Sequence, residues 1–262
     1  MSLQNLLINF LFLFCHYTGK ANLADSIEFR QYSGKIFNNP TALNALKNKI
    51  SQAGSSLVSI KVLHIGDSHV KSGYFSEPFM EKLNSYYAQK YSGNLFFTFQ
   101  WFCKTGTKYS DYSDLEELNA QLESESPDLV IISLGTNDAF SGSSRIRFYD
   151  KIDHLIKKIR LLSPQSSILI TTPPDGLKYN NITGVYTRVP ELQDVVRTLV
   201  KYANDNFIAY WDLNQLMGGA GSMNIWAERG LGAADRVHFT QKGYGLFANW
   251  LFESFINTFE RK

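Results

Sequence analysis

Two short segments in distant parts of the sequence carry residue types that suit nucleophilic catalysis. Gly66-Asp67-Ser68 follows an apolar run, and Asp235 precedes His238 by three residues. A serine at a helix N-terminus lies where the helix dipole favours developing negative charge. A carboxylate spaced in this way can accept from one imidazole nitrogen while the other nitrogen faces a nucleophile. Each segment alone also has an ordinary interpretation, because Asp and Ser are common helix N-caps and Asp-x-x-His is more often a surface pair.

Two further segments could stabilise an oxyanion. Asn137 lies in Leu134-Gly135-Thr136-Asn137-Asp138, directly after the most hydrophobic run, so its amide could donate to a developing negative charge. Gly106 lies in Lys104-Thr105-Gly106-Thr107, and a glycine can bring its N–H close to a substrate oxygen because it has no Cβ. Either segment alone is equally consistent with a plain turn.

The elements that must position these segments can be read from the apolar pattern. Short runs rich in Val, Ile and Leu predict strands at 58–65, 94–102, 128–134, 167–172 and 207–213. Amphipathic spacing predicts helices at 74–91, 145–162, 191–206 and 243–259. This alternation predicts a three-layer α/β/α sandwich around a mainly parallel, five-stranded sheet. In such folds, sites form beyond the carboxyl ends of the strands, where the four segments fall.

Taken together, the four segments occur in the order Ser, Gly, Asn, His, and this order resembles the SGNH hydrolase (GDSL-like esterase) family. The resemblance covers roughly residues 58–260. The Gly-x-Asn-Asp and Asp-x-x-His blocks match in full, whereas the glycine block around Gly106 is a loose match. The resemblance implies a flavodoxin-like fold and hydrolysis of an ester without a metal or cofactor.

The resemblance also assigns roles to individual residues. Ser68 would be the nucleophile, His238 the general base and Asp235 the carboxylate that orients it. The backbone N–H groups of Ser68 and Gly106, with the side-chain amide of Asn137, would form the oxyanion hole.

Three neighbouring residues are assigned supporting roles. Asp67 and Asp138 are expected to hold their turns by accepting hydrogen bonds from backbone N–H groups. His69 stands where many family members have Leu, and we expect it to form part of the wall of the site and not to act as the base.

The segment from Trp211 to Leu231 resembles exported bacterial SGNH enzymes that remove O-acetyl groups from peptidoglycan and other glycans. This resemblance favours an O-acetylated carbohydrate as the substrate and partner. Aromatic residues make up 14% of the chain, and we expect Trp226 and neighbouring Tyr residues to offer flat faces to a sugar ring. Three alternatives stay open: an acyltransferase on the same machinery, a lipase-like acylhydrolase, and a non-catalytic glycan-binding module.

Composition excludes several other classes. The 262 residues carry a formal charge of +2 without a dense Lys/Arg cluster, so no nucleic-acid partner is expected. The five histidines show no metal-ligand spacing and there are only two cysteines, which argues against a metal site. No Gly-x-Gly-x-x-Gly follows the first predicted strand, which argues against a dinucleotide cofactor.

The first 21 residues differ from the rest and predict a signal peptide. Leu6–Cys15 is an apolar run too short to span a bilayer, and small residues precede a cleavage position after Ala21. We therefore expect an exported protein, periplasmic or extracellular, without stable membrane insertion. A helix packed on the domain and a lipid anchor at Cys15 are the alternatives. Residues 22–56 are expected to pack on the core as an extension, and residues 57–262 to form the hydrolase domain.

Overall fold

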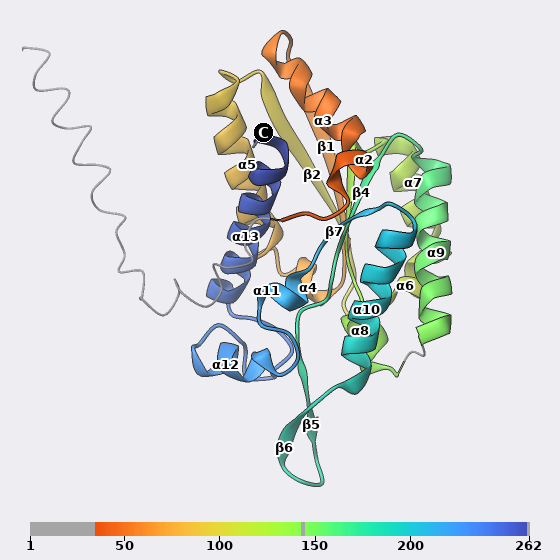
Figure 1. The fold of residues 1–262 in the computed structure, drawn as a ribbon, viewed down its shortest axis with the longest axis vertical. Helices are drawn as coiled ribbons and strands as arrows, with labels where there is room; N and C mark the ends of the chain where they lie inside the picture. The colour runs from red at the N-terminus through yellow and green to blue at the C-terminus, as the bar shows by residue number, and fades with distance from the viewer. Residues whose placement is uncertain (1–34, 143–144, 261–262) are drawn as a thin grey trace, which may run out of the picture. The chain divides into compact units, whose positions relative to one another are not determined.

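A five-stranded parallel sheet forms the centre of the protein in the computed structural model, which describes residues 35–142 and 145–260 (Figure 1). The strands lie in the order β2-β1-β3-β4-β7, and every neighbouring pair is parallel. Side chains of β4, and all but the last of β3, are buried, because helices cover both faces of the sheet. The strands are β1 (Val58–Gly66), β2 (Leu95–Cys103), β3 (Leu129–Ser133), β4 (Ser167–Thr171) and β7 (Ala209–Trp211).

Helices form a layer on each side of this sheet, so the predicted three-layer α/β/α sandwich is confirmed. One layer contains α5 (Ser76–Lys90) and α13 (Gln241–Glu260), and the other contains α9 (Arg145–Leu162) and α10 (Pro190–Asp205) (Figure 1). Shorter helices complete the described chain: α2 (Asn39–Ala42), α3 (Asn44–Ser51), η2 (Gln52–Gly54), α4 (Ser68–Lys71), α6 (Tyr109–Ser113), α7 (Glu116–Glu125), α8 (Thr136–Phe140), α11 (Leu213–Leu216) and α12 (Ser222–Glu228).

The strand register brings the candidate segments to one edge of the sheet. Gly66 at the end of β1 lies opposite Cys103 of β2 and Ser133 of β3. Ser133 in turn lies opposite Thr171 of β4. The chain leaves β1 for β2 on one side and then crosses to β3 on the other. Ligands bind at such a switch point in open α/β sheets, because the loops diverge there and leave a crevice.

Residues 35–56 pack against the sheet, and the first of them cover β7, the last strand in the sheet order. Phe37 pairs with Tyr210 of β7 in an antiparallel bridge, and the two rings stack with centroids 4.8 Å apart. Leu46 and Ile50 of α3 are buried. This packing protects the short edge strand β7 from pairing with another chain. The predicted leader, residues 1–21, lies outside the described residues, as do residues 22–34 of the expected extension.

One prediction from the apolar pattern needs correction, and one pair of strands is absent from the predictions. The strand predicted at 207–213 spans only 209–211, because Asp212 accepts a hydrogen bond from the Gln215 N–H and begins α11. An antiparallel hairpin of β5 (Leu177–Asn180) and β6 (Val185–Arg188) was not predicted at all. Its Asn and Thr residues interrupt the apolar pattern that identifies a strand. The other predicted strands and helices agree with the structure to within two residues at each end.

Candidate active site

The sharp turn after β1 fixes the position of Ser68. A Cβ on Gly66 would meet the Val70 side chain at 2.2 Å, so only glycine fits between strand and helix. Asp67 caps α4, and its carboxylate accepts a hydrogen bond of 2.9 Å from the His69 N–H. Ser68 is therefore the first residue of α4 and lies just beyond the carboxyl end of a central strand.

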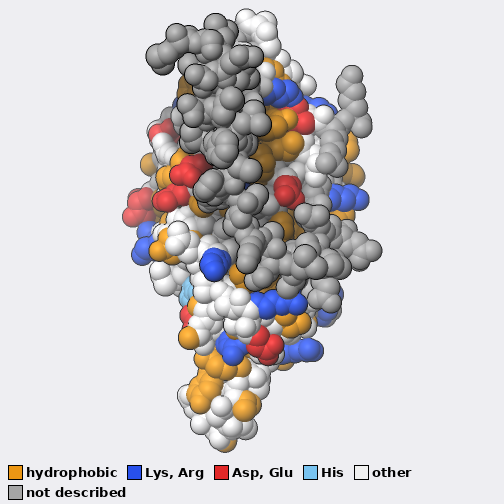
Figure 2. All heavy atoms as spheres, turned by 90° about the vertical axis from the view of Figure 1, so that its left-hand side faces the viewer, with side chains coloured by type: hydrophobic (Ala, Val, Ile, Leu, Met, Phe, Trp, Pro, Cys, Tyr) orange, Lys and Arg blue, Asp and Glu red, His pale blue; other side chains and the backbone are white. Residues whose placement is uncertain are grey.

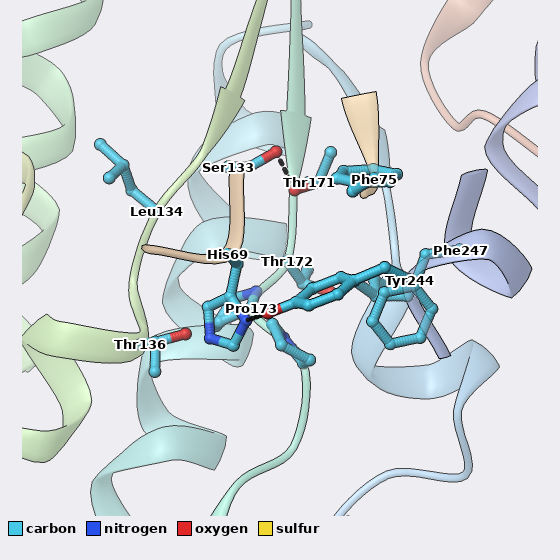
Figure 3. Close-up of a pocket in the computed structure, with 12 residues that line it drawn as sticks. His69, Phe75, Ser133, Leu134, Thr136, Thr171, Thr172, Pro173, Tyr244 and Phe247 are labelled. Atoms are coloured by element: carbon cyan, nitrogen blue, oxygen red, sulfur yellow. Dashed lines mark hydrogen bonds between the residues drawn. The ribbon is translucent and has the colours of Figure 1, made fainter. Parts of the chain in front are cut away.

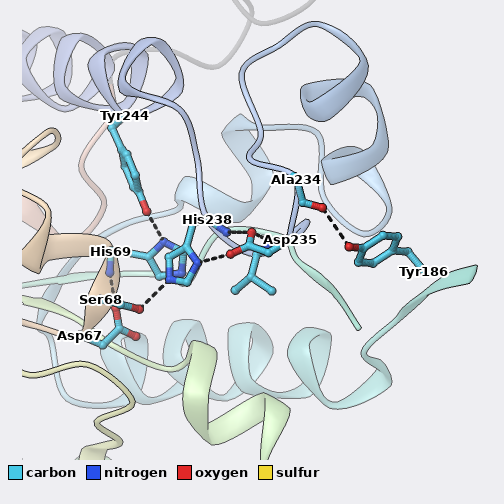
Figure 4. Close-up of polar contacts among 9 residues, drawn as sticks. Asp67, Ser68, His69, Tyr186, Ala234, Asp235, His238 and Tyr244 are labelled. Atoms are coloured by element: carbon cyan, nitrogen blue, oxygen red, sulfur yellow. Dashed lines mark hydrogen bonds and ion pairs between the residues drawn. The ribbon is translucent and has the colours of Figure 1, made fainter. Parts of the chain in front are cut away.

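The structure joins Ser68, His238 and Asp235 in one hydrogen-bonded chain (Figure 4). Ser68 Oγ lies 2.9 Å from His238 Nε2, and His238 Nδ1 lies 2.6 Å from Asp235 Oδ2. The other carboxylate oxygen, Asp235 Oδ1, accepts from the backbone N–H groups of Val237 and His238, each at 2.9 Å. This geometry lets His238 accept a proton from Ser68 while Asp235 holds the ring orientation.

The loop of residues 234–238, here named the Asp-His loop, favours an ionised Asp235. Burial alone would raise the pKa of Asp235, but hydrogen bonds from the His238 ring and two backbone N–H groups outweigh it and lower that pKa. Arg236, which lies between Asp235 and His238 in the sequence, has a φ of 57°, a left-handed conformation that closes the turn. An ionised Asp235 can stabilise the imidazolium that forms when His238 takes a proton.

Asn137 lies at the start of α8, and its amide connects two neighbouring loops. Its Nδ2 donates to Asp67 Oδ2 at 3.0 Å and to the carbonyl oxygen of Thr107 at 3.1 Å. The bond to Thr107 brings the adjacent Gly106 to the same corner of the site. Gly106 is exposed and has a φ of 80°, a conformation that favours glycine. The structure thus gathers the segments of Ser68, Gly106 and Asn137 at one edge of the sheet.

Asp67 and Asp138 both hold backbone N–H groups, as expected. Burial raises the pKa of Asp67 to about 7, although the His69 N–H and the charge of His238 oppose this shift. Asp138 is fully buried and accepts from the Tyr109 N–H at 3.2 Å. Burial raises the pKa of Asp138 to about 6, against the opposing effects of that hydrogen bond and of Lys151. Both carboxylates therefore join loops that meet at the site.

His69 forms a wall behind the imidazole of His238, as the sequence suggested. The two ring centroids lie 5.1 Å apart, and His69 Nδ1 lies 3.0 Å from the Tyr244 hydroxyl. Figure 3 places the His69 ring between Tyr244 and Thr136, at a small cavity that all three residues line. Burial lowers the pKa of His69 to about 3, and the charge of His238 lowers it further. A ring that is so difficult to protonate is a weak base, and the nitrogen that lies next to Ser68 Oγ belongs to His238.

Trp226 does not provide a sugar-binding face, which corrects the expectation from sequence. It is fully buried, and its indole N–H donates to the Met217 carbonyl at 2.9 Å. Its ring packs against Phe239, Phe247 and Trp250 under the loop that leads to His238. The residue is a core anchor for that loop, since a large aromatic ring here buries apolar surface and satisfies its single donor.

Sequence reasoning missed the contacts between the β5–β6 hairpin and the Asp-His loop. The Leu177 N–H donates to the Arg236 carbonyl at 2.8 Å. Figure 4 shows the second contact, in which the Tyr186 hydroxyl donates to the Ala234 carbonyl at 2.9 Å. The Arg236 guanidinium lies 5.7 Å from the Tyr186 ring centroid. The sequence contains a weak indication of this hairpin, because a loop with Gly184 separates two short runs that each contain a Tyr.

The described residues contain no group of His, Cys, Asp and Glu arranged to hold a metal ion. Among the same residues, no helix is long and apolar enough to cross a membrane.

The model of the GDSL-like lipase/acylhydrolase family matches residues 64–246. The chain belongs to this family. As a GDSL-like lipase/acylhydrolase, it is a carboxylic ester hydrolase of the SGNH type, and the matched residues contain all four candidate segments. A comparison of the sequence with curated proteins gives no match.

Several solved structures share the fold of this GDSL-like esterase. A peptidoglycan O-acetylesterase is 18% identical with a TM-score of 0.75, over 87% of this chain and 99% of that chain. An acetyl xylan esterase is 18% identical with a TM-score of 0.54, over 74% and 99% of the two chains. A two-domain esterase active on acetylated mannans is 18% identical with a TM-score of 0.60, over 83% of this chain. The match covers 54% of that two-domain chain, so this esterase spans about half its length. At such identities the likeness concerns the fold.

Proposed function

We propose that this esterase removes O-acetyl groups from carbohydrate, such as peptidoglycan or an acetylated polysaccharide, through an acyl-enzyme on Ser68. The observation that carries the proposal is the chain of short contacts from Ser68 through His238 to Asp235, at 2.9 and 2.6 Å. A binding module that had lost catalysis would have no need of this complete arrangement.

His238 carries the proton in each step of the proposed reaction. Ser68 Oγ attacks the carbonyl carbon of the ester while His238 Nε2 takes the hydroxyl proton, and Asp235 stabilises the resulting imidazolium. The C–O bond to the sugar then breaks, and the sugar oxygen leaves with the proton from His238. Water attacks acetyl-Ser68 and gives a proton to His238. The bond from the acyl carbon to Ser68 Oγ then breaks as Oγ takes the proton from His238, and acetic acid leaves and ionises to acetate.

The oxyanion of both tetrahedral intermediates would be held by the N–H groups of Ser68 and Gly106 and by the Asn137 amide. Asn137 has two amide hydrogens, and they already face Asp67 and Thr107. One of them must therefore be shared with the oxyanion or turn toward it. A bond that strengthens only as the charge develops lowers the barrier without tightening substrate binding.

Three considerations support acetylated carbohydrate as the substrate class. The printed names of three structural neighbours concern peptidoglycan O-acetyl groups, acetylated mannans and acetyl xylan. The segment Trp211–Leu231 resembles exported enzymes of this kind. The apolar run Leu6–Cys15 predicts a leader that would take the protein to the periplasm or the cell exterior, where such polymers are found.

Acetate release from substrates of different acyl length tests the proposal. We expect release from O-acetylated peptidoglycan or acetylated xylan, and little hydrolysis of octanoyl and palmitoyl esters. The reason is that each methylene added to an acyl group in a small pocket changes discrimination by about 10–200-fold. A preference for the long acyl chains would contradict the proposal and favour a lipase-like acylhydrolase. Transfer of acetyl to an added sugar in place of water would identify an acyltransferase.

A further inference from the structure

The β5–β6 hairpin continues from the carboxyl end of β4 and extends beyond the sheet edge that carries Ser68 (Figure 1). Its tip is held by local hydrogen bonds. Asn180 Oδ1 accepts from the N–H groups of Ile182 and Thr183, at 2.9 and 3.1 Å. The Gly184 N–H donates to the Asn180 carbonyl at 2.8 Å, with a φ of 71° at Gly184 that suits glycine. The hairpin therefore keeps its shape without a packing partner at its tip.

The base of the hairpin is fixed to the loops around the triad. Besides the bonds from Leu177 and Tyr186 to the Asp-His loop, the buried carboxylate of Asp175 accepts from the N–H groups of Gly221 and Met223. These two bonds, at 2.9 and 3.0 Å, join the start of the hairpin to α12. A ligand on the hairpin would therefore be held in a fixed relation to His238.

The hairpin exposes an unusual share of apolar surface for so short a segment. Tyr179 and Tyr186 lie directly opposite each other, with ring centroids 5.1 Å apart. Tyr179 is 49% exposed and Tyr186 is 37% exposed. Ile182 at the tip is 95% exposed and Val185 is 53% exposed. In Figure 2 hydrophobic side chains gather at this lower end of the molecule, with Lys and Arg side chains just above them. Clustered exposed apolar groups with polar neighbours are typical of a binding surface.

The chemistry of this surface fits a chain of sugars. A pyranose has an apolar C–H face and a rim of hydroxyl groups, and a tyrosine offers both a flat ring and a phenolic O–H. Lys178 and Thr187, on the alternate positions of the two strands, add polar groups along the same hairpin. If the acetylated sugar lies at Ser68, its neighbours in the polymer must pass over adjacent surface. The hairpin is bonded to the Asp-His loop and provides that surface.

We propose that the β5–β6 hairpin is a binding platform for the polysaccharide that carries the ester, with Tyr179 as a residue that stacks on a sugar ring. This inference rests on the proposed function and deepens it, since it assigns recognition of the polymer to a segment separate from the triad. Hydrolysis of a small acetyl ester needs only the triad and the oxyanion hole. Efficient hydrolysis of a polymer needs the hairpin as well.

Tyr179→Ala separates the two requirements, because Tyr179 touches no residue of the triad. We expect kcat/KM on acetylated xylan to fall by about tenfold, mainly through KM, since a ring contact of this kind is worth about a factor of ten. The kcat/KM on p-nitrophenyl acetate should stay at the wild-type value. Phe96→Ala is the matched control, because Phe96 is also exposed, at 40%, and lies near the amino end of β2, whereas the hairpin lies beyond the carboxyl ends of the strands. It should leave both substrates unaffected.

Binding measured without turnover distinguishes failure of the platform from failure of the proposed function. In native gels containing acetylated xylan, the wild type should be retarded and Tyr179→Ala should migrate as in a gel without xylan. Equal migration of the wild type and Tyr179→Ala in the xylan gel would overturn the platform. So would an equal fall in the kcat/KM of Tyr179→Ala on acetylated xylan and on p-nitrophenyl acetate. Retardation that depends on Tyr179, without acetate release by the wild type, would overturn the proposed function and support the platform. Binding to phosphatidylcholine vesicles in place of xylan would instead make the hairpin a lipid-binding surface and overturn the inference.

Discussion

Asp67 connects the nucleophile segment to the candidate oxyanion hole although it lies outside the triad. One carboxylate oxygen holds the start of α4 through the His69 N–H, and the other holds the Asn137 amide. Both bonds need an acceptor, which the ionised carboxylate supplies best. Because burial raises the pKa of Asp67 to about 7, protonation as the pH falls through neutrality weakens these bonds by turning one of the two acceptor oxygens into a hydroxyl. The orientation of Asn137 thus depends on a group that titrates near physiological pH.

Asn137→Ala tests the role of the amide. We expect kcat on p-nitrophenyl acetate to fall by about 10²–10³-fold with little change in KM, since the bond to an oxyanion strengthens in the transition state. Steady-state kinetics give both parameters. Asn249→Ala is the matched control, because its amide donates to Glu253 on α13 and touches none of the site residues. A rise in KM at constant kcat would make Asn137 a substrate-binding group.

At the scale of elements, a chain of polar groups, buried except for the half-buried Ser133, joins three strands and a helix behind the site. His64 of β1 lies 3.0 Å from the Ser76 hydroxyl of α5 and 2.8 Å from the Ser133 hydroxyl of β3. The Thr171 hydroxyl of β4 donates to Ser133 at 2.8 Å. Ser133 is then left to donate to His64 Nε2, and His64 Nδ1 donates to Ser76. Burial lowers the pKa of His64 to about 3, so the ring is neutral at pH 7 and can accept from one hydroxyl while it donates to the other.

His64→Gln tests this chain through the pH dependence of stability. The unfolded chain binds the His64 proton near its ordinary pKa of 6.5, whereas the folded chain binds it only near 3. Neutral His64 therefore makes its full contribution to the free energy of unfolding above pH 6.5, and this contribution is lost as the pH falls toward 3. Between these two pH values the free energy of unfolding falls by at most ~1.4 kcal/mol per pH unit because of this group. Urea unfolding between pH 4 and 7 should show a shallower loss of the free energy of unfolding for the variant. Parallel pH profiles for both proteins would contradict the assignment.

At the scale of the whole molecule, the sheet could be predicted because its strands have local causes, whereas the roles of the triad residues came from the family resemblance. Continuous Val/Ile/Leu runs such as 129–132 specify buried parallel strands. Their carboxyl ends meet at one edge, so Ser68 and Asn137, which follow adjacent strands, were expected to be close. The hydrogen bonds of Asp67, Asn137 and Thr107 confirm that closeness.

Features that depend on tertiary packing could not be predicted in this way. Whether Trp226 is exposed depends on the aromatic side chains that α13 brings against it, and its composition-based role as a sugar platform was wrong. The hairpin has only four residues in each strand, and its bonds to the Asp-His loop join residues about 50 to 60 positions apart. His64 looked like one residue of a strand, and only the register revealed its hydroxyl partners.

Covalent labelling of Ser68 tests the central claim most directly. A fluorophosphonate reacts with a serine only when a neighbouring base activates the hydroxyl and donors hold the phosphoryl oxygen. Mass spectrometry of the treated protein should reveal a single adduct on the peptide that contains Ser68, together with complete loss of esterase activity. His238→Ala should slow the labelling, and Ser68→Ala should abolish it. Full esterase activity in Ser68→Ala, or an inactivating adduct on another residue, would contradict the account.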